Sequence, residues 1–181
     1  MIEKRAACLI LAALVLASPF PAAVAGEFNA VFNGKSLHLG AQEEWNEDNY
    51  GLGLEYEFSS KSRWKPRLMA NGFRDSNEQM SYMAGGGLHR TLYSTERFNG
   101  LYIDAGINAF LMTRQDINDN RPFPGILPSL TIGNDYLGMN VTYMPKKAVE
   151  EIYDNRMIDP SMSGIVFLQF KLAMSPRSRA D

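Results

Sequence analysis

From residue 26 onward, apolar and polar residues alternate with a period of two over most of the chain. In the clearest stretch, residues 100–110, one face carries Leu101, Ile103, Ala105, Ile107 and Ala109, and the other carries Tyr102, Asp104, Gly106 and Asn108. A period of two places successive side chains on opposite faces of a β-strand. The same region has no apolar run near the ~20 residues that a spanning helix needs. If this chain enters a bilayer, it must do so as a closed β-barrel, in which every backbone group finds a partner.

The alternating segments number eight, at residues 34–42, 50–58, 66–74, 79–89, 99–110, 125–133, 136–143 and 163–172. We therefore predict an all-β fold, an eight-stranded antiparallel transmembrane β-barrel, which is the smallest usual size. One face is apolar and the other is polar but seldom charged, which suits lipid outside and a filled lumen inside. A soluble lipocalin-like barrel would have the reverse pattern. With a periplasmic N-terminus, the loops near 43–49, 75–78, 111–124 and 144–162 lie on the cell exterior.

The N-terminus has the pattern of a secretory signal peptide: Lys4 and Arg5 precede an apolar run, and Ala23-Val24-Ala25 supplies a small-residue cleavage site. We expect a signal peptide at 1–25, a barrel at 26–172 and a disordered tail at 173–181. Cys8, the one cysteine, lies in the signal, so the barrel has neither a disulfide nor a thiol nucleophile. A formal net charge of −2 gives no basic surface for nucleic acid.

Three residues form a candidate catalytic group. Parity places His38 on the lumen side of the first strand, and Asp75 and Ser76 follow the third strand within the segment GFRDSN. Both strands run outward, so all three residues are expected near the exterior end. A base, an acid and a hydroxyl are the residue types for a base-activated alcohol nucleophile or for general acid–base acyl transfer. The alternative is an Asp-Ser turn with a hydrogen-bonded lumen histidine. His89 falls at a periplasmic strand end and is expected to be structural.

Gly87, the last residue of Gly85-Gly86-Gly87, is predicted to face the lumen. One interpretation is a bulge or bend that lets a small barrel curve. The other is that the missing side chain leaves space for a long apolar group. Parity also directs Leu127, Ile165 and Phe167 inward, where they would line such a pocket.

Prolines gather at the start of the sixth strand, as Pro122, Pro124 and Pro128, and Pro145 ends the seventh. Because proline cannot donate to a strand ladder, the outer ends of these two strands are predicted to separate and open a lateral gap toward lipid. Simple termination of the loops is the alternative. The segment QDINDN that includes Asp116 and Asp119 fits a solvated loop better than a site for a divalent cation or a lipid phosphate.

The blocks GFRDSN, AGGGL, LYIDAGINAFLMTRQD, RPFPGILPSLTIG, MNVTYMP and FLQFKL occur in the order and at the spacing of the lipid A palmitoyltransferases of the PagP type. The resemblance covers residues 68–172 well and the region of His38 loosely. It implies an eight-stranded barrel in the outer membrane of a Gram-negative bacterium, acting as a monomer. The amphipathic helix that precedes the barrel in that family has no counterpart in residues 26–35.

Transferred by position, the family's functional residues correspond to a set that the residues themselves had indicated. The catalytic group is His38, Asp75 and Ser76, the acyl-pocket floor is Gly87, and the lateral opening is flanked by Pro124, Pro128 and Pro145. Arg74 is expected either to meet a lipid phosphate or to be a solvated charge at the rim.

The resemblance implies a phospholipid:lipid A acyltransferase that moves a palmitoyl chain from a phospholipid donor to lipid A, the acceptor within lipopolysaccharide. His38 would be the general base, Asp75 would orient it, and Ser76 would be the nucleophile or a polarising donor. No metal or organic cofactor is expected. The alternatives are a non-enzymatic structural or adhesive barrel, a lipid-binding or transport barrel, and a lipid A deacylase.

Overall fold

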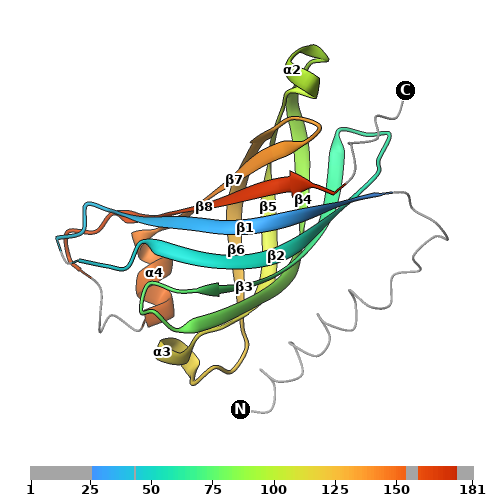
Figure 1. The fold of residues 1–181 in the computed structure, drawn as a ribbon. Coiled ribbons are helices and arrows are strands. Elements are labelled where there is room, and N and C mark those ends of the chain that lie inside the picture. Colours follow the sequence, from blue (N-terminus) through green and yellow to red (C-terminus); the bar gives the residue numbers. More distant parts are fainter. Residues whose placement is uncertain (1–25, 43, 154–158, 175–181) are drawn as a thin grey trace.

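The computed structural model describes residues 26–42, 44–153 and 159–174. Eight antiparallel strands follow one another around a closed barrel, and β1 hydrogen-bonds to β8 to complete it (Figure 1). The strands are β1 (Gly26–Leu39), β2 (Asp48–Phe58), β3 (Trp64–Arg74), β4 (Met80–Ser94), β5 (Tyr102–Thr113), β6 (Phe123–Gly133), β7 (Leu137–Pro145) and β8 (Gly164–Ala173). The predicted eight-stranded antiparallel barrel is confirmed.

Short helices mark the two ends of the barrel. The loops after β1, β3, β5 and β7 form one end, which we call the α3–α4 rim after α3 (Gln115–Asn118) and α4 (Lys146–Tyr153). The loops after β2, β4 and β6 form the other end, the α2 rim, with α2 (Arg97–Gly100). Figure 1 shows α2 and the pair α3 and α4 at opposite ends. The sequence had assigned the same two sets of loops to opposite ends.

The first strand begins at Gly26, so the predicted start at residue 34 is wrong. The pairing register of β1 shifts in the middle of the strand. Against β8 the shift falls between Asn33 and Ser36, and against β2 it falls between Asn33 and Lys35. Such a bulge moves the inward phase by one residue, which hides the earlier half of the strand from a search for one continuous alternation. At the other end β8 reaches Ala173, and Met174 N–H donates to the Phe28 carbonyl. The predicted signal and the rest of the tail lie outside the described residues.

The outer wall is apolar and exposed. Large exposed side chains on it include Leu52, Leu54, Leu88, Ile107, Leu111, Ile126 and Leu130. Aromatic residues mark both ends of this band, with Tyr50, Tyr82 and Tyr143 toward the α3–α4 rim and Trp64, Tyr93 and Tyr136 toward the α2 rim. An apolar band between aromatic girdles is typical of outer-membrane barrels. In the part of the chain that the structure describes, no helix is long and apolar enough to cross a membrane.

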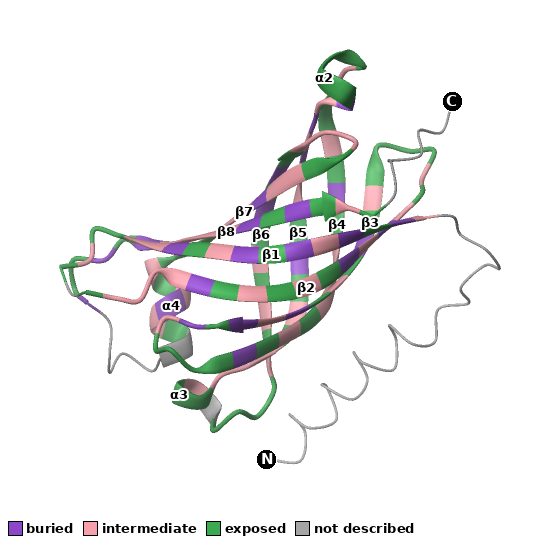
Figure 2. Ribbon diagram, viewed as in Figure 1, coloured by how far each residue is buried: buried purple, intermediate pink, exposed green. Residues whose placement is uncertain are grey.

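Many of the buried inward side chains are polar or charged, and Figure 2 shows buried and exposed residues alternating along the strands. Toward the α2 rim the lumen is filled by a charged network around Arg67. Its guanidinium lies 2.8 Å from Glu57 and 2.5 Å from Asp104, and Nη1 lies 3.1 Å from His89 Nδ1. Lys171 pairs with Glu55 beside it. Buried charges require partners of opposite sign, and this paired network makes the half of the lumen next to the α2 rim a polar plug.

One seam of the barrel is incomplete. β6 pairs with β5 as far as Phe123, but it pairs with β7 only from Ser129–Thr142 to Gly133–Gly138. Pro124 and Pro128 lie in the part of β6 that lacks this pairing. The outer ends of the two strands are thus separated, as the prolines had predicted, and the opening leads toward the α3–α4 rim.

Candidate active site

A cavity of about 170 Å³ occupies the half of the barrel next to the α3–α4 rim. This is far more than the ~10–15 Å³ that one water requires. Most of its wall is apolar: Met69, Phe73, Met83, Phe110, Met112, Phe123, Leu127, Met144, Ile165 and Phe167. The inward orientation predicted for Leu127, Ile165 and Phe167 is confirmed. Polar groups line it at the rim, where Ser36, Asn49, Asp75, Ser76 and Arg114 lie, and deeper, where Asn108 and Gln169 lie. The cavity therefore combines a mostly apolar wall with a group of polar side chains at the rim.

His38 and Ser76 meet at this rim. His38 is the penultimate residue of β1, and Ser76 follows β3. His38 Nε2 lies 3.3 Å from Ser76 Oγ. The imidazole stacks on Trp45, with ring centroids 5.3 Å apart and planes inclined by 18°. The Trp45 ring restricts the rotation of the imidazole, so the Nε2 edge stays directed at the hydroxyl. The structure thus brings together the histidine and the hydroxyl that the sequence had grouped as candidate base and nucleophile.

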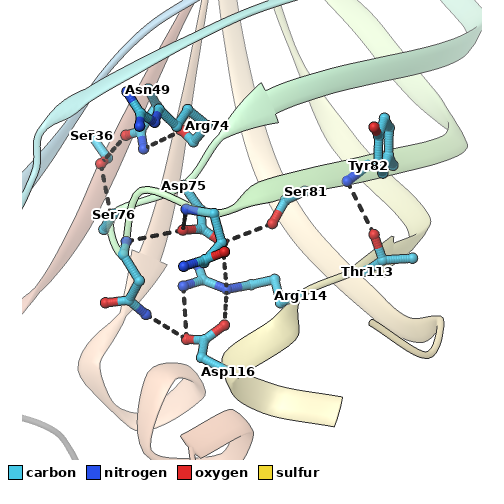
Figure 3. Close-up of polar contacts among 12 residues, drawn as sticks. Ser36, Asn49, Arg74, Asp75, Ser76, Ser81, Tyr82, Thr113, Arg114 and Asp116 are labelled. Carbon is cyan, nitrogen blue, oxygen red and sulfur yellow. Dashed lines mark hydrogen bonds and ion pairs between the residues drawn. The ribbon is translucent and has the colours of Figure 1, made fainter. Parts of the chain in front are cut away.

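Ser36 and Asn49 extend the contact. Asn49 Nδ2 donates to the Arg74 carbonyl over 2.8 Å, so its Oδ1 accepts the hydroxyl proton of Ser36. Ser36 Oγ also lies 3.3 Å from Ser76 Oγ, as Figure 3 shows. Because the Ser36 proton is already donated, Ser36 can only accept from Ser76. The single proton of Ser76 therefore has two competing acceptors, Ser36 Oγ and His38 Nε2.

Asp75 is fully buried and acts on its own turn. Its Oδ1 accepts from the backbone N–H groups of Asn77 and Gln79 at 2.9 and 3.1 Å, and its Oδ2 accepts from the Ser81 hydroxyl at 2.8 Å. Within the described part of the chain, His38 is not among its hydrogen-bond partners. The expectation that Asp75 orients His38 has no supporting contact. Its carboxylate instead fixes the turn that carries Ser76, which is the ordinary chemistry of an aspartate in a turn.

Arg114 closes the rim beside this turn. Its Nε lies 3.7 Å from Asp75 Oδ2, and its Nη2 lies 2.9 Å from Asp116. Asn77 Nδ2 donates to the same Asp116 carboxylate over 2.7 Å. Asp116 therefore contributes to this cluster, although QDINDN was interpreted as a solvated loop. Arg74, by contrast, is exposed and lies 3.7 Å from Glu78.

Gly87 faces the lumen as predicted, but the expected open space beside it is filled. A Cβ added at this position would overlap Asn108 Oδ1 and would lie 3.1 Å from His89 Nε2. His89 Nε2 and Asn108 Oδ1 are hydrogen-bonded at 2.9 Å. Asn108 lines the cavity and Gly87 does not. Because Gly87 has no side chain, it leaves room for the side chain of Asn108, which lines the cavity in its place.

Several members of the site were not singled out from the sequence. Arg114 has the same inward parity as Phe110 and Met112. The predicted fifth strand ended at residue 110, and extending its alternation to residue 114 would have identified Arg114. Ser36 and Asn49 also have inward parity, but nothing in the sequence pairs them. Pro124, Pro128 and Pro145 do not line the cavity themselves. Gly125 and Ile126, which lie between Pro124 and Pro128, do line it. Among the described residues there is no cluster of three or more side chains of the types that bind metals.

Comparison with known proteins identifies relatives. A family model described as antimicrobial peptide resistance and lipid A acylation protein PagP matches residues 32–155. Lipid A acyltransferase PagP of Methylobacillus flagellatus is 31% identical over 105 residues, which are 57% of this chain and 54% of the relative. The protein of the same name from Laribacter hongkongensis is 30% identical over 108 residues, which are 57% of this chain and 48% of the relative. The chain spans about half the length of these curated relatives.

Proposed function

The chain belongs to the PagP family of lipid A acylation proteins, and from this premise we propose that it is a phospholipid:lipid A acyltransferase of the outer membrane. The donor is a phospholipid, the acceptor is lipid A, and the transferred group is a palmitoyl chain. The protein acts as a monomer in a Gram-negative bacterium.

The observation that carries this proposal is the position of the His38–Ser76 contact at the mouth of an apolar cavity. A base and a hydroxyl at the open end of a pocket lined by methionine, phenylalanine and aliphatic side chains match a substrate with one reactive ester and one long apolar tail. The apolar outer wall supports a position within lipid, where such substrates are concentrated.

The reaction begins with attack by a hydroxyl oxygen on the donor's ester carbonyl. His38 Nε2 takes the proton of that hydroxyl as the new bond to the acyl carbon forms. The bond from the acyl carbon to the glycerol oxygen then breaks, and His38 returns the proton to that oxygen, releasing a lysophospholipid. If Ser76 is the nucleophile, a lipid A hydroxyl attacks the acyl-serine in a second cycle of the same proton transfer. If Ser76 is a polarising donor, the lipid A hydroxyl attacks directly.

The donor's acyl chain enters from the membrane through the unpaired outer ends of β6 and β7. This opening adjoins the cavity wall at Gly125 and Ile126, so the chain reaches the pocket without leaving an apolar environment. Pro124, Pro128 and Pro145 keep the opening free of ladder hydrogen bonds. Gly87 acts on the pocket through Asn108. Arg74, exposed at the rim, is the cation for the donor's phosphate.

The purified protein in mixed micelles tests this proposal, with a phospholipid that carries a labelled palmitoyl chain and lipid A as acceptor. Label appearing in lipid A, with an equal amount of lysophospholipid, supports it. Label that stays in the donor while remaining bound to the protein indicates a lipid-binding barrel. Shortened lipid A indicates a deacylase, and unchanged lipids indicate a structural barrel.

A further inference from the structure

The carboxylate next to His38 belongs to Glu47. Its Oε1 accepts a hydrogen bond from the backbone N–H of His38 at 3.2 Å. The backbone pairing of β1 with β2 ends at Lys35–Asp48. Beyond it, Ser36 N–H donates to the Glu47 carbonyl over 2.9 Å, and the Glu47 side chain supplies the following acceptor. Glu47 is therefore fixed against β1 twice, through its backbone carbonyl to Ser36 and through its side chain to His38.

The second ring nitrogen of His38 is Nδ1. Nδ1 is bonded to Cγ and is the ring nitrogen nearer the backbone, where the Glu47 carboxylate lies. It is buried, and within the described residues it has no hydrogen-bond partner. A buried ring nitrogen without a partner is unusual, so no hydrogen bond to Nδ1 sets the tautomer of His38, and the charges around the ring influence it.

The protonation of His38 decides where the Ser76 proton goes. With the ring proton on Nδ1, Nε2 is an acceptor and Ser76 can donate to it. With the ring proton on Nε2, His38 donates to Ser76 and the serine proton turns to Ser36. Only the first tautomer leaves Nε2 free as a base, and the surroundings of the other ring nitrogen influence which tautomer forms.

We propose that Glu47 is a positioning residue for the acyl transfer: its negative charge, fixed beside His38, favours the ring proton on Nδ1 and stabilises the imidazolium that forms when Nε2 takes a proton. The inference rests on the proposed acyltransferase function. Asp75 is not available for this role because its oxygens bind the turn and Ser81. The other charges beside His38 are the Arg114 guanidinium, which opposes the imidazolium, and Asp75, which is adjacent to Ser76 and lies near Arg114.

The test is Glu47→Gln in the full-length protein, because glutamine keeps an oxygen for the His38 N–H and removes only the charge. The matched control is Glu44→Gln, an exposed carboxylate on the same loop. Glu47→Asp, which keeps the charge, is the conservative variant. The chain has two histidines, so nitrogen-15 spectra in detergent micelles can report the tautomer of each.

In Glu47→Gln we expect the fraction of His38 with a proton on Nδ1 to fall and kcat to drop by roughly 10- to 100-fold, below the full ~10²–10⁴-fold contribution of a general base. The KM for the donor changes little. Loss of the anion lets the imidazole stay neutral to lower pH, so the acid limb of the activity profile moves down by about one pH unit. Glu47→Asp recovers part of the rate, and Glu44→Gln matches the wild type.

An unchanged His38 tautomer and acid limb in Glu47→Gln would overturn the inference, even if the rate fell. A wild-type protein that transfers no acyl chain would instead overturn the proposed function. The tautomer comparison is independent of activity and would still be decisive for Glu47.

Discussion

His38 Nε2 and Ser76 Oγ lie 3.3 Å apart although 38 residues separate them in the chain. The contact exists because the first and third strands both end at the α3–α4 rim, and because the bulge in β1 directs Ser36 and His38 into the lumen. Trp45 stacks on the His38 ring, and Ser36 contacts the Ser76 hydroxyl. An imidazole and a hydroxyl are thereby placed at the rim of a cavity whose wall is mostly apolar.

Removal of either member of this pair should stop the chemistry and spare the fold. We expect His38→Ala and Ser76→Ala each to reduce the acyl transfer rate by on the order of 10²–10⁴-fold. Steady-state transfer of labelled palmitate measures this. Ser62→Ala, an exposed serine at the α2 rim, is the control that should behave as wild type. Near-normal transfer by both variants would show that the pair is not the catalytic one.

Asp75 should affect stability as well as activity. Asp75→Ala leaves two backbone N–H groups and the Ser81 hydroxyl without their acceptor, at a cost of about 1–3 kcal/mol. The turn then no longer fixes Ser76, so the transfer rate falls too. Urea unfolding in micelles measures the stability change. Asp48→Ala breaks only an exposed ion pair with Lys35 and should cost less than about 1 kcal/mol. Equal stability of the two variants would contradict the assigned role of Asp75.

The choice of acyl chain length should depend on Asn108. Asn108→Ala removes the amide above Gly87 and deepens the cavity, so longer chains gain preference. Gly87→Ala adds a methyl group that pushes the same amide into the cavity, so shorter chains gain preference. Each buried methylene contributes about 0.8 kcal/mol, which corresponds to roughly fourfold in relative rate. Competition between donors of different chain length measures the shift.

The matched control for chain length is Gly138→Ala, at an inward glycine near the α2 rim where an added Cβ meets only the Tyr102 hydroxyl closely. It lies beyond the charged plug and should leave the preference unchanged. If Asn108→Ala and Gly87→Ala shift the preference in the same direction, Asn108 is not the floor of the pocket.

Closing the seam between β6 and β7 should block the donor. Pro128 and Tyr143 are the first outward pair beyond the end of the ladder, and a disulfide between cysteines placed there would join the strands. The one cysteine of the chain, Cys8, precedes β1, so residues 26–181 contain no other. We expect the double variant Pro128→Cys, Tyr143→Cys to be inactive when oxidised and active when reduced.

The control for the seam is Ala70→Cys with Ala84→Cys, a directly paired outward position on β3 and β4. Oxidation there should not alter transfer. An oxidised β6–β7 variant with full activity would mean that the donor reaches the cavity by another route.

The number of strands and their inward and outward faces could be predicted because successive side chains of a barrel strand alternate between lipid and lumen. This alternation produces the period of two in the sequence. Parity alone placed His38, Leu127 and Phe167 correctly. The start of β1 could not be predicted because the bulge after Asn33 interrupts the alternation that defines a strand.

Side-chain partners were less predictable than faces. Parity directs Gly87 inward but does not state that Asn108, from the neighbouring strand, fills the space beside it. Adjacency to Ser76 suggested that Asp75 serves His38, whereas a buried carboxylate is satisfied by the nearest donors, which are in its own turn. Glu47 lies in a loop without periodicity, so its contact with His38 depends on where the β1–β2 ladder ends.

The most direct test of the central claim is the mass of lipid A extracted from Gram-negative cells that express this protein. We predict a gain of one palmitoyl group over cells without it, and no gain with His38→Ala or Ser76→Ala at equal amounts of folded barrel in the outer membrane. Lipid A of unchanged or reduced mass in cells with the wild-type barrel would contradict the account.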